Sequence, residues 1–578
     1  MSARRGILIL FFLFLVSAGA MFFVFSMLGR APAAPRHART MLVWDVPFDL
    51  PEAALPTRAF SLPLSGLYSD RPTVYDVTSA IRRAAHDDRV RSMVLHIQVV
   101  NWGWAKIEEV RSALLDFRAS GKPLYAILSF SGEREYLLAS AAGRIGMQPT
   151  DPLYLDGLAA GAMFFRGAMD KLGVNPNFEH VGEYKSAVEQ YTRTELSPEG
   201  REAEEAVIDD LYGVFLRAAG ESRGIGEADM RAIVEAGPYL PRTAQAAGLI
   251  DTVLYRAQID SLAARDPRGS LPETEFEDYV KAGGSGHGPK IALLVASGVI
   301  APGRSELSPY EGEIVGSETM IHAIRDIRED ESIDGLVLRI DSPGGSVQAS
   351  DEILGELMQC AEDMPIVVTM SDLAASGGYY IAMAADSIVA HPSTQTGSIG
   401  IYGGKLNVRG LFEKLGLTID LFTRGPNATL LSPYADWNEA QRRIFHDQLE
   451  SHYAQFLAHV AANRGMPLEW ADSLGRGRVW SGAAATRLGL VDASGGYERA
   501  LRMIRELAGI EPEAAIEVVR FPRPKHTFLS QVLNELFSEE GYAVRGVEIP
   551  RIARAWLAAA RFPAGAPLAL MPWCVEAR

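Results

Sequence analysis

Apolar residues without charge fill an early stretch of the chain and do not recur at that length. Ile7–Leu28 (ILILFFLFLVSAGAMFFVFSML) carries no charged side chain. A helix of this length spans roughly 30 Å, the thickness of a bilayer core. A cleaved signal peptide is the alternative, but its apolar region is about 7–15 residues long. The pattern therefore predicts one retained transmembrane helix. Arginines stand on both sides of it, so charge alone assigns no orientation.

After this span, short apolar runs alternate with segments of helical periodicity. Lys290–Ser297, Gly335–Ile340 and Pro365–Met370 have the length and composition of buried β-strands. Gln348–Asp363 spaces its apolar residues as one face of a helix does. Because short apolar strands that alternate with helices are typical of parallel sheets, the pattern predicts an α/β fold.

The pattern also repeats along the chain. Four segments of the first half match segments that lie 243 positions later. The matched pairs are Ala80–Arg82 with Ala323–Arg325, Ser92–Ile97 with Gly335–Ile340, Tyr136–Ile145 with Tyr379–Ile388, and Arg166–Val174 with Arg409–Leu417. A constant register over this distance indicates a duplicated domain rather than chance similarity.

The repeat divides the chain into five parts. We expect a membrane anchor and its flank at 1–39, a first α/β repeat at 40–264, a linker at 265–289, a second α/β repeat at 290–510, and a C-terminal tail at 511–578. The linker contains turn-forming stretches such as AGGSGHGPK. The simplest role for the tail, which includes FLSQVLNELF, is packing against the body or a neighbouring subunit.

Charge and cysteine content exclude several classes of protein. The 578 residues carry a net charge of −16, which argues against nucleic acid as a partner because such binders present a basic face. Two distant cysteines, Cys360 and Cys574, make neither a disulfide framework nor a zinc site. Cys360 falls in an apolar helical pattern, which predicts a buried thiol.

The two halves differ at the places where chemistry would occur. After its strand the second half reads RIDSPGGSV (Arg339–Val347), a tight loop that can point N–H groups at an anion. The first half reads HIQVVNWGW there, and it has Glu133 at the position that matches Ser376. Two candidate catalytic elements are therefore absent from the first half together, which suits one active and one degenerate repeat.

Ser376 has two interpretations. It can cap the helix that follows it, or it can act as a nucleophile. Acyl transfer needs a nucleophile and two N–H donors near the developing oxyanion. Gly377 can supply one donor from the start of the helix, and Gly344 or Gly345 can supply the other. The glycine loop therefore favours the nucleophile.

Two residues are candidates for the base. His391 lies in the same half, but the sequence offers it no well-placed aspartate partner. Lys185, in VGEYKSAVE, lies in a partly apolar setting in the first half. A lysine can act as a base only where burial or a neighbouring cation lowers its pKa.

Four motifs together resemble the signal peptide peptidase A family, also called protease IV, in its long form with two repeats. They are RIDSPGGSV, SDLAASGGYYIAMAAD, TGSIG and GEYKSAVE, and the resemblance covers nearly the whole chain. It implies two tandem repeats of ββα units, similar to the Clp protease and crotonase superfamily, after one N-terminal transmembrane helix.

The resemblance also implies the site residues. Ser376 would be the nucleophile and Lys185, from the other repeat, the general base of a Ser–Lys dyad. Ser398 in TGSIG would hydrogen-bond the lysine amine. The oxyanion would be held by Gly377 and by the DSPGG loop with Gly344 and Gly345. The family needs no metal and no cofactor.

The family's setting implies further expectations. Members of the family form a bowl-shaped homotetramer on the bacterial inner membrane, with the catalytic body on the periplasmic side. Here the lipid contact would be Ile7–Leu28. The expected substrates are cleaved signal peptides and other unfolded apolar peptides.

Two other classes remain as alternatives. A crotonase-like acyl-CoA enzyme would share glycine-rich oxyanion loops, but it would bind coenzyme A and would need neither Ser376 nor an anchor. A membrane scaffold without catalysis would leave the dyad residues apart in space.

Overall fold

The computed structural model describes residues 38–53, 71–284, 286–308, 312–522 and 568–570. The predicted transmembrane helix Ile7–Leu28, Cys574 and most of the tail lie outside these ranges. Within them, no helix combines the length and the apolar character that crossing a membrane requires. Cys360 is buried and unpaired, as the sequence predicts.

The first repeat is built on a six-stranded sheet in the order β6-β4-β3-β2-β1-β9, with all neighbours parallel. Its strands are β1 (Thr40–Asp45), β2 (Val90–Ile97), β3 (Leu124–Leu128), β4 (Arg144–Met147), β6 (Thr252–Val253) and β9 (Glu273–Glu275). Its helices are α2 (Val74–His86), α3 (Trp104–Ala119), α4 (Glu133–Ala139), α8 (Glu227–Glu235), α9 (Pro241–Ala246) and α10 (Arg256–Ala263).

The second repeat is built on an eight-stranded, mostly parallel sheet with the path β20-β18-β16-β14-β10-β22. Its strands are β10 (Lys290–Ser297), β14 (Ile333–Ser342), β16 (Ile366–Ala375), β17 (Ser387–Ala390), β18 (Gln395–Gly397), β20 (Val479–Ser481), β21 (Ala493–Ser494) and β22 (Glu517–Phe521). Its helices are α12 (Ser317–Glu329), α13 (Val347–Ala361), α14 (Gly377–Ile381), α17 (Leu468–Leu474), α18 (Gly482–Leu488) and α19 (Tyr497–Leu507). The three predicted strands and the predicted helix are confirmed.

The same internal hydrogen bonds stabilise each of the two repeats. The Tyr136 hydroxyl donates to Leu249 O in the first repeat, and the Tyr379 hydroxyl donates to Leu490 O in the second, both at 2.8 Å. Likewise Asp251 and Asp492 each accept a backbone N–H at 2.7 Å from the start of a strand. These contacts explain why fold-determining residues persist in the half that lacks the serine.

A third sheet joins the two repeats and the tail. Its order is β12-β13-β11-β15-β23-β19-β5. The strands are β5 (Asn175–Val181), β11 (Val299–Ala301), β12 (Glu306–Ser308), β13 (Gly312–Gly316), β15 (Gly344–Ser346), β19 (Ile401–Asn407) and β23 (Leu568–Leu570). Strand β5 of the first repeat pairs antiparallel with β19 of the second over its whole length.

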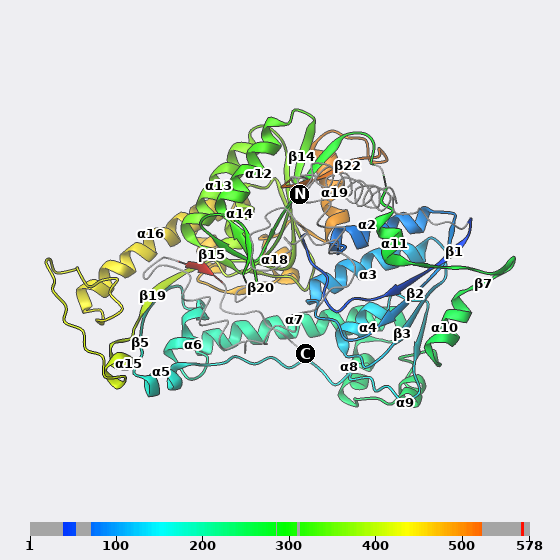
Figure 1. The fold of residues 1–578 in the computed structure, drawn as a ribbon, viewed down its shortest axis with the longest axis horizontal. Helices are drawn as coiled ribbons and strands as arrows, with labels where there is room; N and C mark the ends of the chain where they lie inside the picture. The colour runs from blue at the N-terminus through cyan, green and yellow to red at the C-terminus, as the bar shows by residue number, and fades with distance from the viewer. Residues whose placement is uncertain (1–37, 54–70, 285, 309–311, 523–567, 571–578) are drawn as a thin grey trace, which may run out of the picture.

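Helices and short segments complete the third sheet's surroundings. Figure 1 shows β5, β19 and α15 in a projecting part of the molecule, and the long helix α7 runs from there through the lower middle toward α4 and α8. The elements are α5 (Arg166–Leu172), the 3-10 turn Ser186–Val188, α6 (Glu189–Thr192), α7 (Pro198–Arg223), α15 (Arg409–Lys414), the 3-10 turn Ala382–Ala384, and α16 (Glu439–Arg464).

The segment expected to be a coil between the repeats contains regular structure. It includes a hairpin of β7 (Arg265–Asp266) and β8 (Gly269–Ser270), then β9 and helix α11 (Phe276–Lys281). Strand β9 extends the first sheet, and Phe276 and Tyr279 are buried against it. The glycines of this segment predicted turns, and the side chains of Phe276 and Tyr279 explain why it is also anchored to the first repeat.

Buried charges join the two repeats behind the central strands. Arg339 on β14 is fully buried and reaches Glu52 at 3.1 Å and Glu109 at 3.3 Å, both from the first repeat. Across the same boundary, Asp372 on β16 accepts the N–H groups of Gly103 and Lys106 at the start of α3. Complementary charge therefore fixes how the repeats sit.

Arg339→Ala should lower the free energy of unfolding by about 3–5 kcal/mol, because it removes the guanidinium that lies between the buried carboxylates of Glu52 and Glu109. The measurement is urea unfolding followed by tryptophan fluorescence. Arg409→Ala is the control, since the Arg409–Glu413 pair is exposed and should contribute less than about 1 kcal/mol. Equal midpoints for the two variants would contradict a structural role for the buried cluster.

Candidate active site

Ser376 lies at the corner between β16 and α14. Its backbone has φ of 56° and ψ of −114°, a conformation that is rare for a serine. The corner is held because Ser376 N–H donates to Gly397 O and Ser376 O accepts from Tyr380 N–H, both at 2.8 Å. Although Ser376 stands at the cap position of α14, its side chain makes no capping hydrogen bond. The hydroxyl is therefore free for another partner.

That partner is Lys185. Its Nζ lies 2.8 Å from Ser376 Oγ, 2.9 Å from Ser398 O and 3.0 Å from Ser398 Oγ. All three residues are fully buried. No carboxylate among the described residues pairs with this amine, and burial alone moves the pKa of Lys185 well below its usual value. An amine in this environment can hold its lone pair free at neutral pH.

The backbone of Lys185 is held by a loop of the second repeat that the sequence did not single out. Tyr184 N–H donates to Arg476 O at 2.9 Å. A Cβ on Gly477 would lie 2.4 Å from Lys185 N, so only glycine allows this approach. The only sequence feature that marks this loop is the pair of closely spaced glycines in GRGR, which by itself predicts no more than a turn.

Ser398 presents both of its oxygens to the lysine. Its φ is 49°, another conformation that is uncommon for a residue with a side chain. Its N–H donates to Arg478 O at 2.7 Å, which fixes this turn. The strained backbone aims the carbonyl and the hydroxyl at one point, and Lys185 Nζ occupies that point.

The glycine loop forms β15 beside the nucleophile. Gly344 has φ of 94°, and its N–H donates to Ser342 Oγ at 3.1 Å. Gly345 pairs with Ile300 on β11. Gly377 begins α14, where backbone N–H groups lack intrahelical partners. A Cβ on Gly378 would lie 2.7 Å from Ser342 O, so the start of α14 and the end of β14 touch through a glycine.

A strand from the tail lies along this loop. In β23, Leu568, Ala569 and Leu570 pair antiparallel with Ser346, Gly345 and Gly344 of β15. Leu568 is buried in a cluster with Ala187, Val188 and Tyr402, next to the segment that carries Lys185. The edge of β15 therefore accepts an extended chain with an apolar side chain.

His391, the other candidate base, lies elsewhere in the hydrogen-bond network. Its Nε2 is 3.1 Å from Glu109 Oε2, inside the buried charge cluster between the repeats. The structure thus supplies the acidic partner that the sequence did not reveal, but it places the pair at Arg339. Of the two candidates, Lys185 is the one that reaches the Ser376 hydroxyl.

Comparison with known proteins gives the family. The sequence profile of peptidase family S49 matches the chain twice, over residues 116–266 and 359–511, which confirms the internal repeat. A solved 1510-N membrane-bound stomatin-specific protease covers 40% of this chain and 97% of its own, with 15% identity and a TM-score of 0.26. That score is too low for an argument, so the likeness to Clp proteases and crotonases stays a prediction.

Curated relatives match over most of the chain. It is 33% identical to "Serine protease SPPA, chloroplastic" of Arabidopsis thaliana, over 81% of this chain and 69% of the relative. It is 32% identical to "Protease 4" of Salmonella typhi, over 88% and 84% respectively. With "Protease 4" of Haemophilus influenzae it shares 29% identity over 77% and 74%. The chain therefore belongs to peptidase family S49 and is a serine peptidase.

Proposed function

We propose that the protein is a membrane-anchored endopeptidase that uses a Ser376–Lys185 dyad to degrade cleaved signal peptides and other apolar peptides. The observation that carries the proposal is the 2.8 Å contact between Ser376 Oγ and the fully buried Lys185 amine. Neither an acyl-CoA enzyme nor a scaffold would need a desolvated lysine at a strained serine.

The geometry suits a neutral lysine as the general base. A neutral amine has two N–H groups and one lone pair. The N–H groups donate to Ser398 O and Ser398 Oγ, and the lone pair accepts the Ser376 hydroxyl proton. Ser376 Oγ then attacks the peptide carbonyl. Ser398 acts here as a positioning residue, because it leaves the lone pair a single direction.

The glycine residues stabilise the oxyanion that forms. Gly377 N–H points from the start of α14, and the Gly344–Gly345 loop supplies the second donor. Gly344 N–H now donates to Ser342 Oγ, so it becomes available only when that bond opens. Lys185 next protonates the leaving amine, and water hydrolyses the acyl-enzyme. No step uses a metal or an organic cofactor.

The peptide lies along β15, in the place that β23 occupies. Main-chain hydrogen bonds to a strand edge suit any extended sequence, and side-chain pockets give preference. Leu568 fills a buried position beside Val188, which supports a preference for apolar residues. Unfolded peptides can adopt this extended form, whereas a folded domain cannot.

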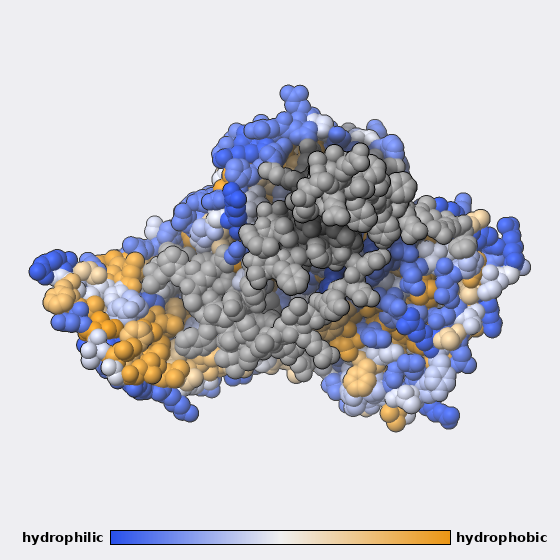
Figure 2. All heavy atoms as spheres, in the orientation of Figure 1, coloured by the Kyte–Doolittle hydropathy of each residue, from blue (hydrophilic) through white to orange (hydrophobic). Residues whose placement is uncertain are grey.

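We further propose that Ile7–Leu28 anchors a homotetramer in the bacterial inner membrane, with the catalytic body in the periplasm. The projecting part of the molecule supports self-association. Figure 2 shows apolar side chains gathered at its end, in the region of β5, β19 and α15 of Figure 1. The exposed apolar residues there are Leu172, Leu415, Leu417, Leu421, Phe422 and Leu431. Apolar groups gathered in this way mark interaction surfaces.

Ser376→Ala and Lys185→Ala should each reduce turnover by at least about 10³-fold, because members of a catalytic unit fail together. Lys185→Arg should not restore activity, because arginine does not give up its proton. The assay is hydrolysis of a fluorogenic apolar peptide by the full-length protein in detergent. Lys171→Ala, on the exposed face of α5, is the matched control and should keep wild-type activity.

Two results of this assay would contradict the dyad. Full activity in Lys185→Ala would mean that Lys185 is not the base. If the wild-type protein hydrolyses no peptide, the result would support the membrane scaffold over the endopeptidase.

The value of kcat/KM should rise from acid toward alkaline pH. The protonated amine cannot accept the Ser376 proton, so activity appears as Lys185 loses its proton. Because burial lowers the pKa of Lys185, the rise should be complete well below the usual lysine range near 10.5. The measurement is kcat/KM between pH 5 and 9.5, with circular dichroism to verify folding at each pH. A flat profile would mean that no base, Lys185 included, titrates between pH 5 and 9.5.

A further inference from the structure

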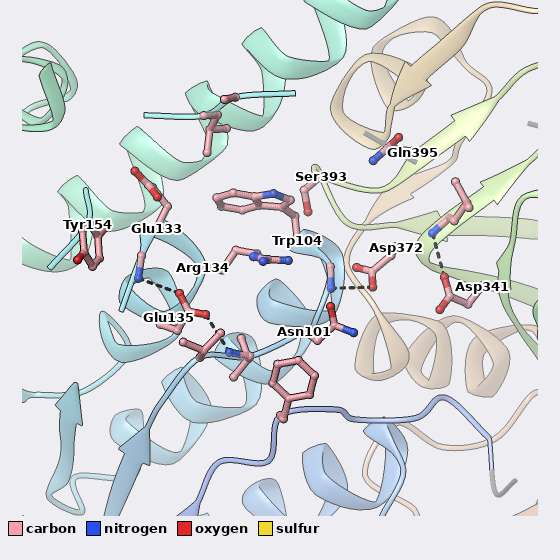
Figure 3. Close-up of a pocket in the computed structure, with 18 of the residues that line it drawn as sticks. Asn101, Trp104, Glu133, Arg134, Glu135, Tyr154, Asp341, Asp372, Ser393 and Gln395 are labelled. Atoms are coloured by element: carbon pink, nitrogen blue, oxygen red, sulfur yellow. Dashed lines mark hydrogen bonds between the residues drawn. The ribbon is translucent and has the colours of Figure 1, made fainter. Parts of the chain in front are cut away.

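The first repeat contains a cavity at the place that matches the active site of the second. It has a volume of about 1170 Å³, and Val100, Asn101 and Glu133 line it. These residues stand 243 positions before Pro343, Gly344 and Ser376. The far wall comes from the second repeat and includes Asp341, Asp372 and Gln395 (Figure 3).

Acyl-transfer chemistry is blocked in this cavity by its own residues. The Glu135 carboxylate accepts Val100 N–H and Gly132 N–H, both at 2.9 Å. The N–H of Asn101, at the position that matches Gly344, donates to Phe48 O at 2.7 Å, and Glu133 replaces the nucleophile. The cavity keeps the fold of a peptide site, so it can bind a peptide but cannot cleave one.

Glu133 gives the cavity an unpaired buried acid. The residue is 4% exposed, and its Oε1 accepts the N–H groups of Asp156 and Gly157 at 2.9 Å. No cation among the described residues pairs with this carboxylate. Burial, with a smaller effect of Asp156, raises the pKa of Glu133. A buried carboxylate without a counter-charge favours a ligand that brings one.

The charges around Glu133 point the same way. The cavity is lined by six acidic side chains and one basic side chain, Arg134, which donates to Trp102 O. Two of the acids, Asp341 and Asp372, lie 3.7 Å and 3.8 Å from the Lys106 amine, which offsets part of their charge. The acids are Glu133, Glu135, Asp156, Glu313, Asp341 and Asp372. The indole Nε1 of Trp104, in the centre of Figure 3, is buried without a hydrogen-bond partner. Anionic ligands are therefore disfavoured, and a donor for a ligand carbonyl is present.

Apolar side chains form the open side of the cavity. Phe48, Val99, Phe130 and Tyr154 are each between 40% and 59% exposed, which is unusual for such residues in one place. The rings of Phe130 and Tyr154 are 5.7 Å apart. A second cavity of about 410 Å³ shares Phe48, Val99 and Phe130, so the apolar wall continues beyond the acids.

We infer that this cavity is a second peptide-binding site, which takes a lysine or arginine side chain next to an apolar stretch of an extended peptide. The cationic head lies among the carboxylates at Glu133, and its methylene stem and the apolar neighbours lie on the aromatic rings. The inference rests on the proposed function, because the same peptide continues to Ser376. Asp372 precedes Ser376 by four positions on β16, roughly 13 Å along a strand.

The test measures binding without catalysis. The full-length Ser376→Ala protein in detergent is titrated with two fluorescein-labelled, N-acetylated apolar peptides, and fluorescence anisotropy is recorded. One peptide carries two lysines beside its apolar run, and the other carries glutamines there. Acetylation removes the terminal amine as a competing cation. The lysine peptide should bind at least about tenfold more tightly at low salt, and added salt should reduce the difference.

Variants of the cavity separate its charge from its apolar wall. Glu133→Gln in the Ser376→Ala background should remove most of the lysine preference, whereas Glu439→Gln, on an exposed face of α16, should leave it unchanged. Tyr154→Ala should weaken both peptides alike. Asp156→Asn, at an exposed position, should reduce the preference several-fold and serves if Glu133→Gln does not fold.

An unchanged lysine preference in Glu133→Gln and in Asp156→Asn would overturn the inference, as would equal binding of the two peptides. Failure of the proposed function looks different. In that case the wild-type protein hydrolyses neither peptide, while binding of the lysine peptide still depends on Glu133.

Discussion

The proposed role of Lys185 as a base requires that water be kept away from its amine, and much of this structure serves that constraint. Lys185 is fully buried, and no described carboxylate offsets the loss of water. Its surroundings must therefore be built from both repeats. The β5–β19 ladder brings the lysine segment to the second repeat, and Gly477 lets the two backbones touch. The Arg339 cluster fixes the repeats behind them.

The duplication divides the work unequally between similar halves. Paired contacts such as those of Tyr136 and Tyr379 preserve the same frame in each. On that frame the second repeat places a strained serine and a glycine loop. The first repeat has Glu133 where the second has the serine and Asn101 where the second has Gly344, and it sends its lysine across the boundary. One complete site thus arises from two incomplete ones.

Local pattern predicted the strands and the helix of the second repeat, because each is encoded within a few consecutive residues, and the constant offset of 243 positions predicted the duplication. Lys185 was one of two candidate bases on its partly apolar setting alone, and the family resemblance chose it over His391. The partners that complete the site lie far away in sequence. Glu109 beside His391, Arg476 beside Tyr184, and β23 beside β15 depend on how distant segments meet. Hydrophobic periodicity carries no information about such tertiary contacts. The strained φ of Ser398 likewise follows from its packing rather than from the letters TGSIG.

The position of β23 sets a threshold for whatever enters the site. Because Leu568–Leu570 belongs to the same chain, its competition for β15 does not weaken on dilution, whereas that of a free peptide does. A short or weakly apolar peptide therefore competes poorly with β23. A long peptide that makes further contacts binds more tightly and displaces β23. If peptides bind along β15 as proposed, selectivity depends on peptide length and total apolar contact as much as on the residues beside the scissile bond.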